Sequence, residues 1–265
     1  MIDWKVTQQR EQFSVLVIGE NCTDIYKMVD VVKFSPEAPI PVVKEVKEYS
    51  IPGMAANVKK NLENLGIHEI DFVTNDWSIT KTRYIDIRSG NQLLRLDDDG
   101  AGIPWSGNLA TKLSEYDAII VSDYNKGFLS YEHIEKIISK VKIPVFIDTK
   151  KQDLARFNTK NTFVKINELE YNSRLSVPEN LIVTVGKKGA WYKTKRSETI
   201  FPTNIVDVVD VCGAGDTFLA ALCAQYLYTK SIDLSIMFAN IAAGLTVQHR
   251  GNYAPSYDEI RNAGY

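Results

Sequence analysis

Short apolar runs rich in β-branched residues alternate along this chain with segments of helical periodicity. They occur at Ser14 to Ile18, Ala118 to Ser122, Val145 to Ile147, Phe163 to Ile166 and Leu181 to Val185. Runs of this kind, separated by helices, are typical of a parallel sheet that helices cover on both faces. We therefore expect an α/β fold that binds its ligands at the carboxyl ends of the strands.

Two further groups of extended segments do not follow this rhythm. One covers residues 29–34 and 40–46 around a proline-containing turn, and the other covers residues 83–88 and 92–96 around Ser89-Gly90-Asn91. We interpret them as a small antiparallel β lid that projects from the main domain, with strands drawn from 29–47 and 82–97. The alternative is that they are edge strands of the main sheet.

Length and composition limit the classes of function. A chain of 265 residues fits a single domain over 1–265, and 31 basic against 33 acidic residues give a formal net charge of −2. This balance gives no global field for nucleic acid or an anionic membrane, so we expect a small-molecule partner. Residues 1–13 do not read as a secretory signal, and no apolar run approaches the roughly 20 residues of a membrane span, so we expect a cytoplasmic protein.

The stretch Gly213-Ala214-Gly215-Asp216 points most directly to a function. Its glycines permit a tight turn, and the alanine- and leucine-rich run behind it predicts a buried helix whose first N–H groups attract an anion. An aspartate there would repel a bare phosphate, but it suits the removal of a proton from a hydroxyl that attacks a phosphoryl group. The alternative is a tight turn in which Asp216 only caps the helix. The first interpretation predicts a kinase.

Polar residues and glycines also follow two other predicted strands. Asn167 and Glu170 can organise hydrated magnesium near a nucleotide phosphate, or they can form an N-cap and its third helical position. Thr184, Gly186 and Gly189 lie where a nucleotide can approach the backbone, although an ordinary hairpin fits the pattern equally well.

Small and polar residues after the first predicted strand are candidates for binding a substrate. Gly53 and Asn57 lie at the start of a helix predicted near 55–65, where small residues allow either close approach of a ligand or a turn into a packed helix. Asp24 can bind sugar hydroxyls or cap the turn that follows it.

Together these segments resemble the ribokinase-like carbohydrate kinases of the PfkB family, in the family's order and over nearly the whole chain. Four motifs resemble the members that phosphorylate the anomeric hydroxyl of D-glycero-D-manno-heptose 7-phosphate. They are the segments 35–43, 80–83, 92–97 and 122–127.

The resemblance implies ATP as the phosphoryl donor, Mg2+ as a cofactor, a sugar phosphate as the acceptor and a homodimer formed through the lid. It makes Asp216 the catalytic base, with Gly213, Ala214 and Gly215 as the anion hole. The residues implied on the nucleotide and magnesium side are Asn167, Glu170, Thr184, Gly186, Gly189 and Asn240. Those implied on the sugar side are Asp24, Gly53, Asn57 and Arg83, with Lys81 and Lys126 added by charge and position.

The chain departs from the family pattern at three places. Glu20 stands where the family usually has aspartate, and Met54 replaces the second of two paired glycines. The segment 70–80 is much shorter than in the family, which usually carries another strand and helix before residues 80–83. These changes concern the sugar side and the lid. They leave two alternatives open: a kinase for another sugar or sugar phosphate, and a non-catalytic sensor of sugar phosphate or nucleotide.

Overall fold

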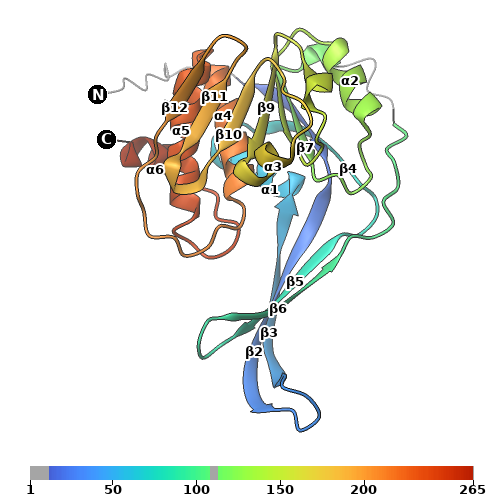
Figure 1. Cartoon of the computed structure of the whole chain (residues 1–265), viewed down its shortest axis with the longest axis vertical. Helices are drawn as coiled ribbons and strands as arrows, with labels where there is room; N and C mark the ends of the chain where they lie inside the picture. The colour runs from blue at the N-terminus through green and yellow to red at the C-terminus, as the bar shows by residue number, and fades with distance from the viewer. Residues whose placement is uncertain (1–11, 108–112, 265) are drawn as a thin grey trace.

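An eight-stranded sheet forms the body of the protein in the computed structural model, which describes residues 12–107 and 113–264 (Figure 1). Its strands run in the order β12-β11-β10-β9-β8-β7-β1-β4. Their bounds are β1 (Ser14–Gly19), β4 (Glu69–Thr74), β7 (Ala118–Asp123), β8 (Val145–Thr149), β9 (Thr162–Asn167), β10 (Leu181–Thr184), β11 (Ala190–Lys193) and β12 (Glu198–Phe201). The six strands β10, β9, β8, β7, β1 and β4 pair in parallel, while β11 and β12 add an antiparallel edge. All five predicted strands are present.

Helices cover both faces of this sheet. Along β1, Val15 and Val17 pack into the core on one face and Leu16 and Ile18 into the core on the other, because successive side chains of a strand alternate. The first face carries α1 (Ala55–Asn64), α4 (Ala214–Thr229), α5 (Ile232–Thr246) and α6 (Tyr257–Ala263). The second carries α2 (Tyr131–Ser139) and the 3-10 segments Leu113–Glu115 and Leu154–Phe157. The expected α/β fold is confirmed.

A second, four-stranded sheet projects from the body as the lid (Figure 1). Its order is β3-β2-β5-β6, with β2 (Asn21–Phe34), β3 (Pro41–Met54), β5 (Thr80–Asp86) and β6 (Gln92–Asp98). The lid strands are therefore not edge strands of the main sheet. The lid is mixed rather than purely antiparallel, because β2 and β5 pair in parallel. These strands continue from β1 and β4, which are parallel neighbours in the main sheet, so both leave the body in the same direction.

The chain re-enters the body at Met54, where β3 ends and α1 begins. Met54 has φ 54° and ψ −131°, a conformation that glycine adopts more readily. Its side chain is buried with Cys22 and Ile79. Burial of this side chain offsets a backbone cost of about 1–3 kcal/mol. Met54 therefore has a backbone conformation typical of glycine, although its side chain is a large apolar one.

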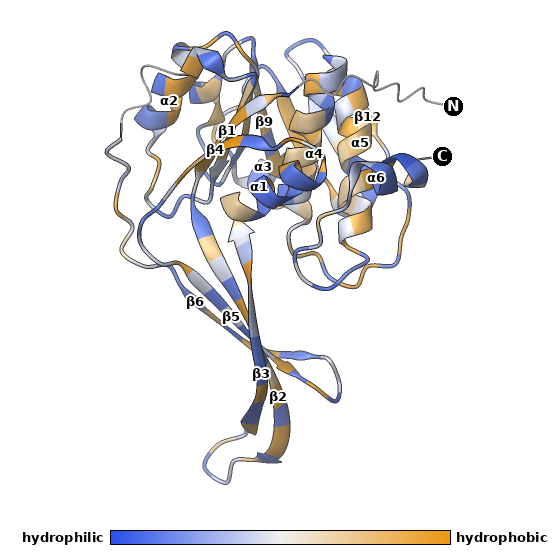
Figure 2. Cartoon of the chain, turned by 180° about the vertical axis from the view of Figure 1, so that it is seen from behind, coloured by the Kyte–Doolittle hydropathy of each residue, from blue (hydrophilic) through white to orange (hydrophobic). Residues whose placement is uncertain are grey.

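Apolar residues occur along the lid strands, coloured orange in Figure 2, and several of their side chains are exposed. The most exposed apolar side chains of the lid are Phe34, Ile40, Val46, Leu94 and Leu96. In the described part of the chain, no helix is long and apolar enough to cross a bilayer.

Candidate active site

The first turn of α4 lies at the junction of the body and the lid. Gly213 forms its N-cap with φ 75°, and no side chain caps the helix. A Cβ at this position would lie 2.8 Å from both Asn252 Oδ1 and Asn57 Nδ2, so only glycine fits. The Ala214 N–H donates to the Val211 carbonyl at 3.4 Å. Because no side-chain oxygen occupies the helix start, the N–H groups of Gly215 and Asp216 are available to an anion.

Asp216 sits in this first turn and is almost fully buried, with 5% of its surface exposed. Its Oδ2 accepts a 3.0 Å hydrogen bond from the Asn57 carboxamide, and its Oδ1 accepts a 2.7 Å hydrogen bond from the Tyr124 hydroxyl. These partners are side chains rather than helix N–H groups. The geometry therefore does not support the capping alternative for Asp216.

The surroundings of Asp216 raise the pKa of its carboxyl toward neutral pH. Burial raises the pKa of this carboxyl to about 6, while the hydrogen bonds from Asn57 and Tyr124 act in the opposite direction. The negative charge of Asp148 raises the pKa further, and Lys165 lowers it. A carboxylate with a pKa near the working pH is well suited to accept a proton.

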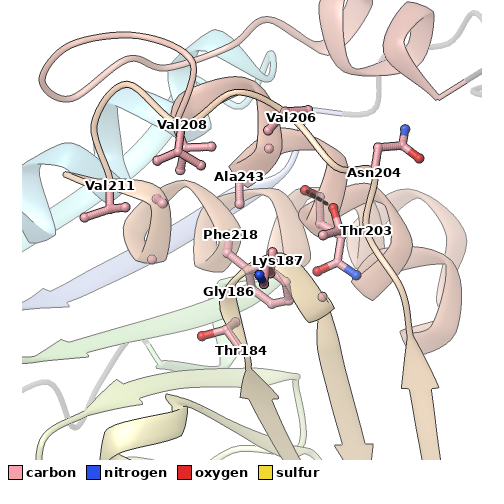
Figure 3. A pocket seen from close by; sticks show the side chains of 16 residues that line it. Thr184, Gly186, Lys187, Thr203, Asn204, Val206, Val208, Val211, Phe218 and Ala243 are labelled. Atoms are coloured by element: carbon pink, nitrogen blue, oxygen red, sulfur yellow. Dashed lines mark hydrogen bonds between the residues drawn. The ribbon is translucent and has the colours of Figure 1, made fainter.

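A cavity of about 410 Å³ opens beside the start of α4 (Figure 3). Ala214 and Gly215, from the first turn of α4, are among the residues that line it. Four residues expected on the nucleotide side also line it, namely Thr184, Gly186, Gly189 and Asn240. Apolar side chains complete its walls, including Val206, Val208, Val211, Phe218 and Ala243. A largely apolar pocket with a few polar groups suits a flat heterocycle joined to an anionic tail.

The hairpin alternative for the segment 184–189 is also realised. Strands β10 and β11 pair antiparallel around a 3-10 turn at Gly186–Lys188, and this hairpin is what brings its glycines to the cavity. Asn240 Nδ2 donates a 2.9 Å hydrogen bond to the Phe201 carbonyl, which ties α5 to the edge strand β12.

Asn167 and Glu170 form a capping box at the start of α3 (Glu168–Ser173). Asn167 Oδ1 accepts from the Glu170 N–H at 2.9 Å, and Glu170 Oε2 accepts from the Asn167 N–H at 2.8 Å. Glu170 also forms an ion pair with Lys150. The pair does not line the cavity, but Asn167 lies opposite Thr184 in the register of the sheet. The cap alternative is thus realised, at the expected edge of the sheet.

Two charged residues in otherwise apolar strands were missed by the sequence analysis. Lys165 on β9 forms a buried 2.7 Å ion pair with Asp148 on β8. A Cβ at Gly215 would lie only 3.0 Å from Lys165 Nζ, so this ammonium group borders the start of α4. Asp148 Oδ1 is buried without a hydrogen-bond partner among the described residues. The sequence signal that could have identified them is a charged residue inside an otherwise apolar strand.

The sugar-side candidates gather around Asp24, which is 4% exposed. Arg83 donates to Asp24 Oδ1 at 2.5 Å, and Asn252 Nδ2 donates to Asp24 Oδ2 at 3.1 Å. A Cβ at Gly53 would lie 2.3 Å from Asp24 Oδ2, which explains the need for glycine there. Asn252, which the sequence analysis did not single out, therefore links Asp24 to the N-cap of α4.

The two lysine candidates differ in their surroundings. Lys81 Nζ lies 5.4 Å from the ring centroid of Tyr124, the residue whose hydroxyl binds Asp216. Lys126 forms a 2.5 Å ion pair with Asp99, and its backbone N–H donates to the buried Glu20. In the described part of the chain, no group of three or more His, Cys, Asp or Glu side chains is placed to hold a metal ion.

Comparison with known proteins identifies the family. The profile described as "pfkB family carbohydrate kinase" matches residues 110–259, more than half of the chain. The chain belongs to the pfkB family of carbohydrate kinases. The expected family and the expected enzyme class, a carbohydrate kinase, are thereby confirmed.

Curated relatives of this pfkB family member carry the name "Bifunctional protein HldE". The protein from Aliivibrio fischeri strain MJ11 is 32% identical in an alignment of 307 positions, gaps included, that covers 96% of this chain. The protein from Vibrio parahaemolyticus is 31% identical, with 94% of this chain covered. The chain spans 64% and 63% of the length of these two relatives.

Solved structures support the same fold. Ribokinase from Thermotoga maritima superposes with a TM-score of 0.74 at 18% identity, covering 95% of this chain and 99% of the ribokinase. Phosphofructokinase-2 from Escherichia coli gives a TM-score of 0.74 at 16% identity, covering 96% and 98%. The ribokinase-like fold is confirmed.

Proposed function

We propose that this kinase transfers the γ-phosphoryl group of ATP to the anomeric hydroxyl of a heptose 7-phosphate. The observation that carries the proposal is the position of Asp216. Asp216 is buried in the first turn of α4, where its neighbours Ala214 and Gly215 line the cavity. On the other side, its partner Asn57 and the Asp24 partner Asn252 both lie against Gly213. The four sequence motifs and the similarity to HldE proteins support the choice of acceptor.

The site supports catalysis by a proton acceptor beside an anion-binding helix start. ATP would lie in the cavity with its terminal phosphate over the uncapped N–H groups of α4, where Lys165 offsets negative charge. Asp216 would accept the proton of the sugar hydroxyl. The hydroxyl oxygen would form a bond to the γ-phosphorus while the bond between that phosphorus and the leaving oxygen of ADP breaks. Positioning and charge neutralisation would supply most of the acceleration.

The donor set near the helix start fits a hydrated magnesium ion. Asp148 Oδ1 is a buried carboxylate oxygen without a partner among the described residues, and Asn167 and Glu170 add oxygens at the same edge of the sheet. Oxygen ligands and bound water are what magnesium prefers. When bound, the ion would neutralise charge on the phosphates.

The sugar side offers cations for an acceptor that carries its own phosphate. Arg83 is held in place by Asp24 and by the ring of Tyr26, whose centroid is 5.3 Å away, and Lys81 lies on the same lid strand. The exposed apolar side chains of the lid support a homodimer formed through the lid. Sedimentation equilibrium tests this: a monomer at all protein concentrations contradicts the dimer.

A substrate panel tests the proposed function. ATP turnover would be measured with heptose 7-phosphate, unphosphorylated heptose, fructose 6-phosphate and ribose, beside calorimetric binding of each sugar. We expect turnover with heptose 7-phosphate and a 31P NMR signal of a sugar 1-phosphate. Turnover with another sugar alone would replace the acceptor, and binding without turnover would indicate a non-catalytic sensor.

A further inference from the structure

Tyr124 is a candidate for a role that no sequence motif assigned to it. It follows β7 directly, and its hydroxyl donates a 2.7 Å hydrogen bond to Asp216 Oδ1. Together with Asn57 on Oδ2, it gives each oxygen of the Asp216 carboxylate one donor. Since a carboxylate oxygen accepts more than one hydrogen bond, an acceptor hydroxyl can still approach. Tyr124 therefore fixes the orientation of Asp216 without occupying all of its lone pairs.

The ring of Tyr124 lies near two cations. Lys81 Nζ from the lid lies 5.4 Å from the ring centroid, and Lys150 Nζ from the body lies 5.6 Å from it. Contacts of this kind attract an ammonium group to the face of an aromatic ring. Removal of the hydroxyl alone would leave these ring contacts in place.

The backbone of Tyr124 is held by Glu20, which is fully buried. Glu20 accepts hydrogen bonds from the backbone N–H groups of Tyr124 at 2.7 Å, Lys126 at 2.9 Å and Phe128 at 3.2 Å. The intervening Asn125 and Gly127 have φ values of 56° and 100°, so the loop curls with alternate N–H groups facing the carboxylate. The unusual glutamate at position 20 therefore anchors the loop that carries Tyr124.

We propose that Glu20 and Tyr124 act as a positioning pair, in which Glu20 fixes the 124–128 loop and the Tyr124 hydroxyl orients the Asp216 carboxylate and favours its ionised form. This inference rests on the proposed role of Asp216 as the base. A hydrogen bond donated to a carboxylate stabilises the charged form over the neutral one. Other charged or titratable groups facing Asp216 are Asp148, Lys165, Lys150 and Cys22. They remain unchanged when only the Tyr124 hydroxyl is removed.

The test is a titration of the Asp216 carboxyl by 13C NMR in the nucleotide-free protein, with Asp216→Asn used to assign the signal. Tyr124→Phe is expected to raise the titration midpoint by about one pH unit, the size expected for loss of one hydrogen bond to a charged group. The matched control is Tyr116→Phe, which removes a hydroxyl bonded to Asp71, a carboxylate outside the site. An unchanged midpoint in Tyr124→Phe would overturn the proposal.

Glu20→Gln tests the second half of the pair. It is expected to raise the midpoint in the wild-type background and to have no further effect in the Tyr124→Phe background, because the two residues act through one hydrogen bond. Effects that add in the double variant would overturn the proposed coupling. The NMR midpoint needs no sugar, so a shift in Tyr124→Phe without turnover on any sugar would sustain the pair and reject the proposed function.

Kinetics provide a readout that a purely structural role would not move. If the kinase is active, Tyr124→Phe is expected to lower kcat/KM by roughly tenfold at a pH below the midpoint and by less at a pH well above it. KM for ATP is expected to remain unchanged. A uniform loss at all pH values would contradict the effect on ionisation.

Discussion

The Asn57 carboxamide donates a 3.0 Å hydrogen bond to Asp216 Oδ2 across 159 positions of the sequence. Asn57 lies in the first turn of α1, directly after lid strand β3 ends at Met54. The element that leads out of the lid therefore also holds the candidate base. A movement of the lid that shifts the start of α1 would change a partner of Asp216.

Replacement of Asn57 by alanine is expected to lower kcat/KM on the acid side of the pH profile. The wild-type profile should fall below about pH 6, because burial raises the pKa of Asp216 to about 6 and only its carboxylate form accepts a proton. Loss of the hydrogen bond from Asn57 raises this pKa, so the fall of kcat/KM on the acid side, the acid limb of the profile, moves to higher pH. Asn64→Ala is the control, since Asn64 lies on the same helix but donates to the Ala254 carbonyl. An acid limb in Asn57→Ala that matches the wild type would contradict this prediction.

The raised pKa of Asp216 also predicts a pH dependence of stability. The carboxyl binds a proton more tightly in the folded than in the unfolded state, so its contribution to the free energy of unfolding falls as pH rises from about 4 to about 6. Between these pH values the free energy of unfolding of the wild type should fall by roughly 2–3 kcal/mol more than that of Asp216→Asn. Urea unfolding of both proteins at pH 4.5 and 7 measures the difference. An equal change in the free energy of unfolding in both proteins would show that folding does not shift the pKa of this carboxyl.

A methyl group at position 53 is expected to disturb the sugar side selectively. In Gly53→Ala the new Cβ would lie 2.3 Å from Asp24 Oδ2, so the Asp24–Arg83 ion pair must shift. We expect KM for the sugar to rise by about tenfold or more, the effect of a small misplacement of binding groups. Binding of a non-hydrolysable ATP analogue to the same variant is the internal control. Equal weakening of both ligands would show general damage instead.

Ala243 offers a test of the nucleotide cavity. It lies on α5 and faces the cavity (Figure 3), so Ala243→Leu fills space that the nucleotide needs. We expect its Kd for an ATP analogue to rise by about tenfold or more, corresponding to at least about 1.4 kcal/mol. Ala155→Leu adds the same volume at an exposed position on the opposite face of the sheet. An unchanged Kd in Ala243→Leu would place the nucleotide elsewhere.

The sequence predicts five of the eight strands of the main sheet, because each of these five carries its own continuous apolar run. It does not predict β4, β11 and β12, which lie toward the edges of the sheet and are less buried. The pairing of the lid strands was less accessible, since the parallel contact of β2 with β5 follows from their exit from neighbouring strands of the body. Local patterns also left the role of Asn167 open, because a capping box and a phosphate-side pair require the same residue types.

Residues that reach the site through tertiary contacts could not be found from local patterns. Asn252 follows α5 and binds Asp24, which lies 228 positions earlier. Tyr124 was visible only as part of a family motif, and its contact with Asp216 depends on how β7 and α4 are placed in the fold. Glu20 was noticed as a departure from the family pattern, but only the structure shows which loop it holds.

The most direct test of the account is the phosphoryl-transfer rate of Asp216→Asn, measured beside the affinity for an ATP analogue. Asp207→Asn is the matched control, because Asp207 is exposed and lies nine positions before Asp216 in the same segment. We expect the rate of Asp216→Asn to fall by roughly 10²–10⁴-fold, with nucleotide affinity and the Asp207→Asn rate close to those of the wild type. Turnover by Asp216→Asn at the wild-type rate would show that this carboxylate is not the base.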